Sequence, residues 1–243
     1  MGAIFRREMK AYFTSPVAYI FISVFFFYTG TFFVSINIYN AISDLSYVFI
    51  YVFLIMMIML PILTMRLFAE ERRQKTDQCL LTAPVSLFSI VFAKFAAALC
   101  VFLCAMSIFA FYLLALSAMG ANIAWSIVWG SLIALLLLGG CFISIGVFVS
   151  SLTENQIVSA IVSIIAGFLF YMMDVMAGSL DSLINSNRNF AALKAVMTSL
   201  GLYTRYAEFS SGILNLESVV FFLSFIFVFI FLTVRVLEKR RWG

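Results

Sequence analysis

The stretch RLFAEERRQKTDQCLLTAPVSLFSIVFAK, residues 66–94, separates two very apolar parts of the chain. Most of its charged residues lie near its start, and Lys94 closes it. Residues 45–65 before it carry no charge, and none occurs from Phe95 to Thr153 after it. A polar passage between two such runs indicates a loop that meets water between membrane-spanning segments.

The composition of the whole chain is that of a membrane protein. Of its 243 residues, 65% are hydrophobic and 11% are charged, with a mean hydropathy of +1.13, whereas soluble domains are about 25% charged. A helix needs about 20 apolar residues to cross the hydrocarbon. We therefore expect one all-α transmembrane domain, residues 1–243. Its predicted spans are residues 17–38, 46–65, 87–117, 124–150, 156–174 and 218–235.

The uneven distribution of Lys and Arg over the predicted loops gives the orientation, because cytoplasmic loops carry the excess. With the N-terminus inside, twelve of these residues face the cytoplasm and only Arg188, Lys194 and Arg205 face outside. We expect both termini in the cytoplasm and the protein in the plasma membrane. The basic residues then act as orientation signals, and no nucleic-acid partner is expected.

Two helical segments are predicted outside the spans. In residues 1–13, Phe5, Met9, Tyr12 and Phe13 share one helical face, and the charged residues occupy the rest. This pattern predicts an amphipathic helix in the cytoplasmic membrane interface. The charged residues are Arg6, Arg7, Glu8 and Lys10. The following apolar run is too long for a signal-peptide core, so we expect no cleavage. Residues 178–216, on the outer side, predict amphipathic or re-entrant helices.

The sequence offers no catalytic, cofactor-binding or metal site. It contains no histidine, no nucleophile elbow and no Walker loop. Cys100 and Cys104 share a helix face, but without a nearby carboxylate they favour packing over metal binding. Gly139, Gly140 and Gly146 lie within a predicted span and favour close helix packing.

Ionisable residues are absent from the predicted span centres, where proton or ion pathways place them. Asp174 and Glu217 fall at the outer ends of their spans. This argues against a pump driven by protons or sodium, so the energy for any transport must come from elsewhere.

Residues 67–82 predict a short helix in the polar loop. Glu70 and Glu71 precede Arg73 and Lys75 at spacings that permit side-chain pairing, and Pro84 disfavours helix just before the third span. The alternative is a solvated linker whose charges only enforce topology.

The string FAEERRQKTDQCLLTAPVSLFSIVFAKF, residues 68–95, resembles the signature of type-2 ABC exporter permeases. The matching positions are Glu70, Glu71, Arg72, Thr76, Leu80, Leu81, Pro84, Val85, Ser86 and Lys94. Where the family usually has glycine before the threonine, this chain has Lys75. The six-span layout and the passage YTRYAEFSSGILNLESVVFF, residues 203–222, resemble the gliding-motility subgroup.

The resemblance implies a permease subunit of an ATP-driven exporter in a bacterial plasma membrane. Two cytoplasmic ATP-binding subunits would hold ATP and Mg, with no cofactor on this chain. A second permease copy or a related permease would complete the dimer, and an extracytoplasmic accessory protein is a further possible partner.

The resemblance also assigns roles to residues. Residues 71–82 would be the coupling helix, and the N-terminal helix would connect beside it. The expected coupling residues are Glu70, Glu71, Arg72, Arg73, Lys75, Thr76, Asp77, Leu80, Leu81 and Pro84. A smaller second contact would use Thr153, Glu154 and Asn155.

Three alternatives stay open from the residues alone. A secondary transporter or channel would need membrane-buried charges or paired broken helices. An intramembrane enzyme would need a catalytic constellation at membrane depth. A membrane scaffold would transmit force to an extracytoplasmic partner, without moving a substrate. The sequence does not identify the substrate, because its many phenylalanines fit a hydrophobic cargo and lipid contact equally well.

Overall fold

The structure is a computed structural model, and it describes residues 2–40, 42, 44–76, 85–121, 123–179, 197–198, 201–210 and 215–242. Every regular element in this part of the chain is helical, and six helices are long and apolar enough to span a membrane. The predicted all-α fold with six spans is confirmed. These candidate spans are Pro16–Tyr39, Ser46–Arg73, Leu87–Ala118, Trp125–Leu152, Gln156–Ser179 and Leu216–Arg241.

Several spans are composite. The first consists of α2 (Pro16–Phe33) and a π-helical segment η1 (Val34–Tyr39), and the second consists of α3 (Ser46–Thr64) and α4 (Arg66–Arg73). The third consists of α6 (Leu87–Met106) and α7 (Ile108–Ala118). The other three are α8 (Trp125–Leu152), α9 (Gln156–Ser179) and α13 (Leu216–Trp242).

Local sequence signals explain where several of these helices begin. Pro16 starts α2, a position where its missing N–H is not needed. The Ser86 hydroxyl caps α6 by accepting from the Ser89 N–H at 3.3 Å. The Asn155 side chain caps α9 in the same way, accepting from the Ile157 N–H at 2.9 Å.

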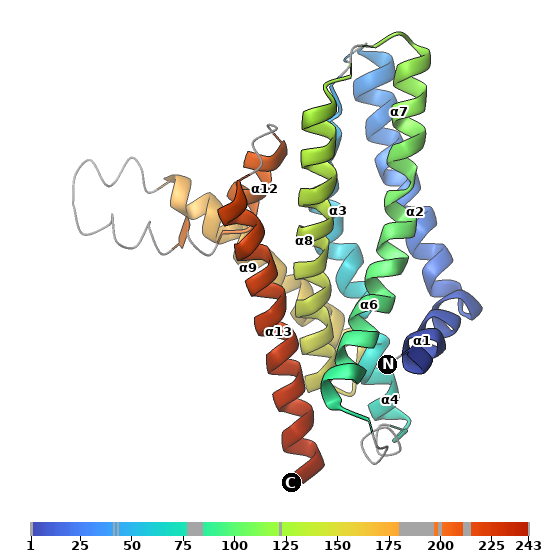
Figure 1. The fold of residues 1–243 in the computed structure, drawn as a ribbon, viewed down its shortest axis with the longest axis vertical. Coiled ribbons are helices and arrows are strands. Elements are labelled where there is room, and N and C mark those ends of the chain that lie inside the picture. The colour runs from blue at the N-terminus through green and yellow to red at the C-terminus, as the bar shows by residue number, and fades with distance from the viewer. Residues whose placement is uncertain are drawn as a thin grey trace, which may run out of the picture.

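Helix α8 lies at the centre of the bundle (Figure 1). It is the most buried span, at 72%, whereas α9 and α13 are 22% and 17% buried. It packs against α3, α13, α9, α6 and α4. Such contact on all sides requires small residues on its surface.

Three glycines of α8 supply this close approach, as the sequence predicts. Gly139 lies against Phe102 of α6, and Gly146 lies against Thr64 of α3. A Cβ on Gly140 would come within 2.8 Å of Ile226 in α13. The glycines therefore serve helix packing, which confirms the expectation.

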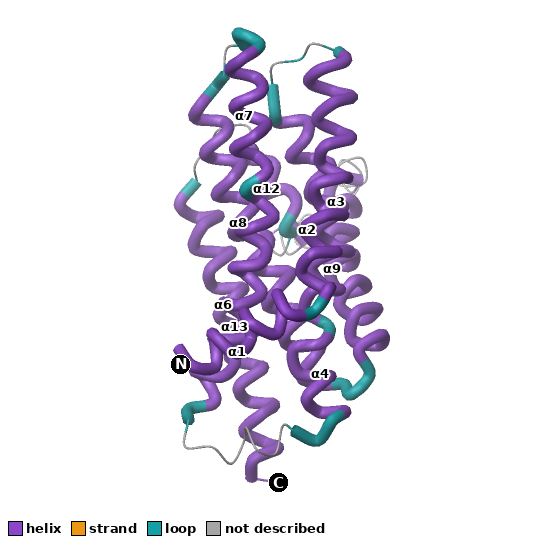
Figure 2. The backbone as a smooth tube through the Cα atoms, turned by 90° about the vertical axis from the view of Figure 1, so that its right-hand side faces the viewer, coloured by secondary structure: helices purple, strands orange, loops and turns teal. Residues whose placement is uncertain are grey.

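Helix α1 (Gly2–Thr14) packs on α6 and α2, in the half of the bundle that holds α4 and the C-terminus (Figure 2). Its apolar side packs on the core: Tyr12 is buried, and Phe5, Met9 and Phe13 are partly buried. Arg6 and Lys10 are exposed. Glu8 departs from the predicted pattern, because it lies on the packed side and is only 8% exposed.

The opposite end carries α12 (Tyr203–Ser210), which packs against α8, α3 and α9. Asp174 caps this helix, accepting from the Tyr203 N–H at 2.8 Å and the Thr204 hydroxyl at 2.7 Å. Asp174 does not end its span as predicted, because α9 continues to Ser179. Much of the segment 178–216 lies outside the described residues, and with it the predicted re-entrant or amphipathic arrangement.

Candidate functional site

The polar stretch continues the second span directly as a helix. Helix α3 ends at Thr64, Met65 keeps helical backbone angles and bonds the Pro61 carbonyl at 2.9 Å, and α4 then runs from Arg66 to Arg73. Leu67, Phe68 and Ala69 form the buried side of α4. The predicted helix at 67–82 is thus present up to Arg73, and residues 77–82 lie outside the described part of the chain.

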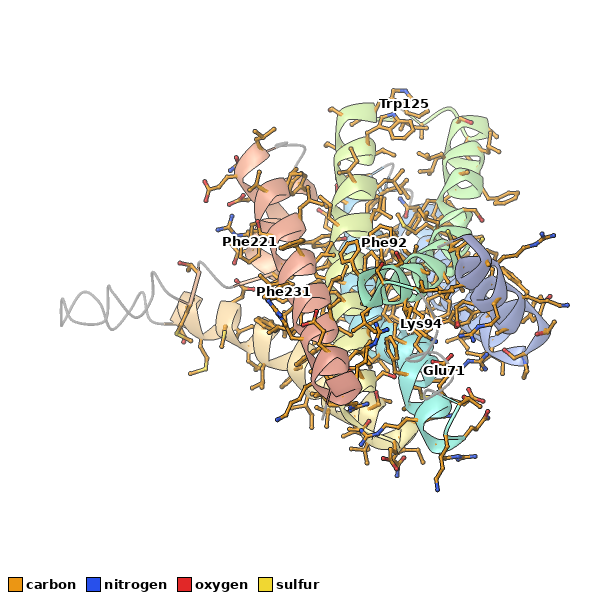
Figure 3. The ribbon with its side chains drawn as sticks, turned by 60° about the horizontal axis from the view of Figure 1, so that its bottom comes forward. Glu71, Phe92, Lys94, Trp125, Phe221 and Phe231 are labelled. Atoms are coloured by element: carbon orange, nitrogen blue, oxygen red, sulfur yellow. The ribbon has the colours of Figure 1, made fainter. Side chains whose placement is uncertain are left out.

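A buried ion-pair network holds one side of α4. The Lys94 ammonium, on a side chain only 1% exposed, lies 3.1 Å from Glu8 and 3.0 Å from Glu71, and it donates to the Leu67 carbonyl at 2.7 Å. Arg7 bonds the same carboxylates, at 2.6 Å to Glu8 and 2.5 Å to Glu71. We call Arg7, Glu8, Glu71 and Lys94 the Lys94 cluster. Figure 3 shows Lys94 and Glu71 close together.

The Lys94 cluster joins three helices that are far apart in sequence. Lys94 itself lies about two turns into α6. Its partners Arg7 and Glu8 belong to α1, and Glu71 belongs to α4. A buried charge is tolerated only when it is paired and hydrogen-bonded, so each member constrains the others. Burial lowers the pKa of Arg7, but bonding to Glu8 and Glu71 outweighs this and raises it, which keeps Arg7 charged.

Further contacts fasten α1 to the α3–α4 junction. The Tyr12 hydroxyl donates to the Leu63 carbonyl at 3.0 Å, and burial raises the Tyr12 pKa, which keeps this donor protonated. Arg66 donates to the Ala11 carbonyl at 3.1 Å and lies over the Tyr12 ring. A cavity of about 350 Å³ lies among these groups, lined in part by Tyr12, Arg66 and the Lys94 cluster.

The other side of α4 is bonded to the end of α8. The Ser150 hydroxyl accepts from the N–H groups of Phe68 at 3.0 Å and Ala69 at 3.1 Å. Arg72 pairs with Glu154 at 2.9 Å and donates to the Leu152 carbonyl at 2.8 Å. Because Glu154 belongs to the predicted second contact, the two predicted contact regions meet in the structure.

The coupling residues predicted from the sequence fall into three groups: residues that bond within the chain, residues exposed at the tip of α4, and residues outside the described part of the chain. Glu71 and Arg72 bond within the chain, and Glu70 pairs with Arg66 at 4.0 Å. Arg73, Lys75 and Thr76 are exposed at the tip. Asp77, Leu80, Leu81 and Pro84 lie outside the described residues.

The sequence spacing permits Glu70 or Glu71 to pair with Arg73 or Lys75. Among the described residues the two glutamates pair elsewhere. Glu70 pairs backwards along α4, and Glu71 faces the Lys94 cluster. Lys75 has left the helix surface, since its φ of 57° lies in the left-handed region. Glycine adopts this conformation without a Cβ clash. It is also the residue that the resembling family usually has at this position.

The predicted second contact forms the turn between α8 and α9. The Thr153 hydroxyl donates to the Asn155 carbonyl at 3.3 Å, and Asn155 caps α9. Glu154 extends outward to Arg72, with 60% of its side chain exposed. The predicted basic residues of α1, Arg6, Arg7 and Lys10, are all exposed, and Arg7 also bonds into the Lys94 cluster with 51% of its side chain exposed.

Sequence reasoning missed Glu8, Tyr12 and Ser150 as members of this site. Glu8 carries a usable signal, because a helix places it on the same face as Phe5 and Tyr12. Ser150 carries none, since serines are frequent in the same span. The described residues contain no group of three metal-ligating side chains, and the contacts of this site join one helix to another.

A family model described as "ABC-2 family transporter protein" matches residues 5–170. The matched region runs from α1 into α9, and it includes α4, the Lys94 cluster and the turn at 153–155. No curated protein matches the chain.

Proposed function

The chain belongs to the ABC-2 transporter family, since the match covers more than half of it, and we propose that it couples ATP hydrolysis on a partner to export across a bacterial plasma membrane. Family membership makes it a multi-pass membrane permease subunit, a type that is normally non-catalytic and that works with an ABC ATP-binding subunit. The coupling element in this proposal is α4 with the residues after it.

The attachment of α4 on both sides carries the proposal. One side is bonded to α1 and α6 through the Lys94 cluster, and the other to α8 through Ser150 and to the α8–α9 turn through Glu154. A displacement of the exposed tip at Arg73, Lys75 and Thr76 would therefore reach several spans together. The tip lies at the same end of the bundle as both termini, as Figure 2 lets the reader follow.

The remaining parts of the proposal follow the family resemblance. ATP and Mg bind to the partner, and this chain holds no cofactor. Two ATP-binding subunits serve a pair of permeases, either two copies of this chain or this chain and a relative. Placement in the gliding-motility subgroup rests on the resemblance of the opening, the six-span layout and residues 203–222, and an accessory protein on the outer side is a further proposed partner. The excess of Lys and Arg supports cytoplasmic termini.

The buried ionisable groups do not favour a secondary transporter. Lys94 is neutralised by two carboxylates, and both Asp174 oxygens accept hydrogen bonds from the start of α12. Each group fastens helices together and lies near one end of its helix, which supports a structural role for these charges.

Purification from the native host in mild detergent, followed by mass spectrometry, tests the partner. We expect a stoichiometric ATP-binding subunit, together with a second permease. The chain arriving alone even after cross-linking would contradict the proposal.

A charge-reversal pair then tests the contact. Arg73 and Lys75 are exposed and have no ion pair within the described residues, so Arg73→Glu with Lys75→Glu changes the tip while the internal ties stay intact. We expect the stimulation of ATP hydrolysis to fall while membrane insertion is unchanged. Arg241→Glu, also exposed and at the same end of the bundle, is the matched control. Equal effects of the two changes would count against the contact.

A further inference from the structure

At the junction between α3 and α4 the regular helical hydrogen bonding is interrupted. An uninterrupted helix bonds each N–H to the carbonyl four residues earlier. The Met65 N–H still makes this bond, to the Pro61 carbonyl at 2.9 Å, and the regular pattern is interrupted directly after it. Groups from outside the helix fill the gap. The Ser150 hydroxyl accepts from the Phe68 and Ala69 N–H groups and donates to the Met65 carbonyl at 3.0 Å. On the other side, Tyr12 bonds the Leu63 carbonyl.

Helix α4 packs chiefly on α8 and next on α9. It follows α3 within one continuous span, Ser46–Arg73, and meets α3 at their junction. Gly146, one turn before Ser150, lets α8 approach Thr64 at the end of α3. Ser150 then reaches the junction itself, and Arg72 extends the attachment to Leu152 and Glu154 beyond the end of α8. The contacts of α4 thus follow α8 along the whole length of α4.

We propose that Met65 is a joint and that Ser150 fastens α4 to α8, so that α4 moves with the end of α8 and not with α3. That α4 and the end of α8 take part in coupling rests on the proposed function, but their attachment to each other does not. Helix α8 is the most buried span, and it also packs against α12 at the opposite end of the bundle. Displacement of α4 therefore enters the bundle through its central helix, and Ser150 is the positioning residue at the point of entry.

Hydrogen exchange on the permease alone tests the joint. Ser150→Ala removes the hydroxyl that bonds two N–H groups and one carbonyl. We expect exchange to rise about fivefold to tenfold for the amides of the whole of α4, from Phe68 to Arg73, with α3 before Leu60 unchanged. If Ser150 acts only as a local cap, the rise is confined to Phe68 and Ala69, and that result overturns the proposal.

Ser151→Ala is the matched control. Ser151 is the next residue and is equally buried, but its hydroxyl donates to Phe148 within its own helix, at 2.7 Å. We expect wild-type exchange in α4. Ser150→Cys is the second variant, of similar size but with a weak sulfur donor and acceptor. Ser150→Cys provides the test if Ser150→Ala does not fold. It should also raise hydrogen exchange for the amides from Phe68 to Arg73. Wild-type exchange in Ser150→Cys overturns the proposal.

An assay on the complex with the ATP-binding subunit separates a positioning role from a purely structural one, because a purely structural role would leave its result unchanged. We expect Ser150→Ala to reduce the stimulation of the partner's ATP hydrolysis by the permease by about threefold to tenfold. Basal hydrolysis by the partner alone should stay unchanged. Unchanged coupling in a variant whose α4 exchanges faster overturns the positioning role. Failure of the wild-type permease to bind any ATP-binding subunit would instead contradict the proposed function, and the exchange comparison is independent of it.

Discussion

Replacement of Lys94 by methionine should destabilise the protein strongly, because it leaves two buried carboxylates without their central cation. The Lys94 ammonium bonds Glu8, Glu71 and the Leu67 carbonyl, at 3.1, 3.0 and 2.7 Å. Removing one partner of a buried ion pair costs about 3–5 kcal/mol. Arg7 still bonds both carboxylates, so we expect the lower end, about 3 kcal/mol. Methionine keeps most of the side-chain volume, which limits any cavity contribution.

The assay is the free energy of unfolding from urea titration in detergent micelles. Lys10→Met, on the exposed side of α1, is the matched control and should change the free energy by less than about 0.5 kcal/mol. Adding Glu71→Gln to Lys94→Met removes one stranded charge, and it should restore about 1–2 kcal/mol. A loss below about 1 kcal/mol for Lys94→Met, or no recovery in the double variant, would refute the reasoning.

Three further changes test other parts of the fold. Lys75→Gly should stabilise the protein by about 0.5–1 kcal/mol, because glycine adopts the positive φ more easily; the same titration measures it, and a loss would contradict the turn. Gly146→Ala should cost about 1–3 kcal/mol through overlap with Thr64, and adding Thr64→Ala should recover part of it; no recovery would mean that the two helices do not meet there. Asp174→Ala should weaken the cap of α12 by about 1 kcal/mol, seen as faster hydrogen exchange at Tyr203, and unchanged exchange would reject the cap.

The spans could be predicted from the sequence because run length and charge-free composition are direct consequences of the bilayer. The ends could not be predicted as well. Helix continues past the apolar run at Arg66–Arg73 and again at the end of α9, where it reaches Ser179. Glutamate and arginine are good helix formers, so the polar composition of Arg66–Arg73 does not end the helix, and in α9 the lone Asp174 is followed by further apolar residues that stay helical.

The site could be predicted only where its chemistry is local. Lys94 stands out as a lone charge in an apolar helix, but its partner Glu8 lies in α1, 86 positions earlier. Ser150 bonds groups more than 80 positions away in the chain. No local pattern encodes such contacts, because they depend on how α1, α4 and α8 pack together.

The two sides of α4 are held by different kinds of interaction. The Lys94 cluster is ionic, and a buried ammonium that slides away from its carboxylates incurs the desolvation cost at once. The Ser150 contact is made of neutral hydrogen bonds, each of which contributes about 1 kcal/mol net. A force on the tip at Arg73 should therefore reach α8 through the Ser150 bonds and reach α1 and α6 through the Lys94 cluster. On that reasoning α4 moves together with the helices bonded to it on both sides, and the adjustment during coupling falls on the junction with α3 at Met65.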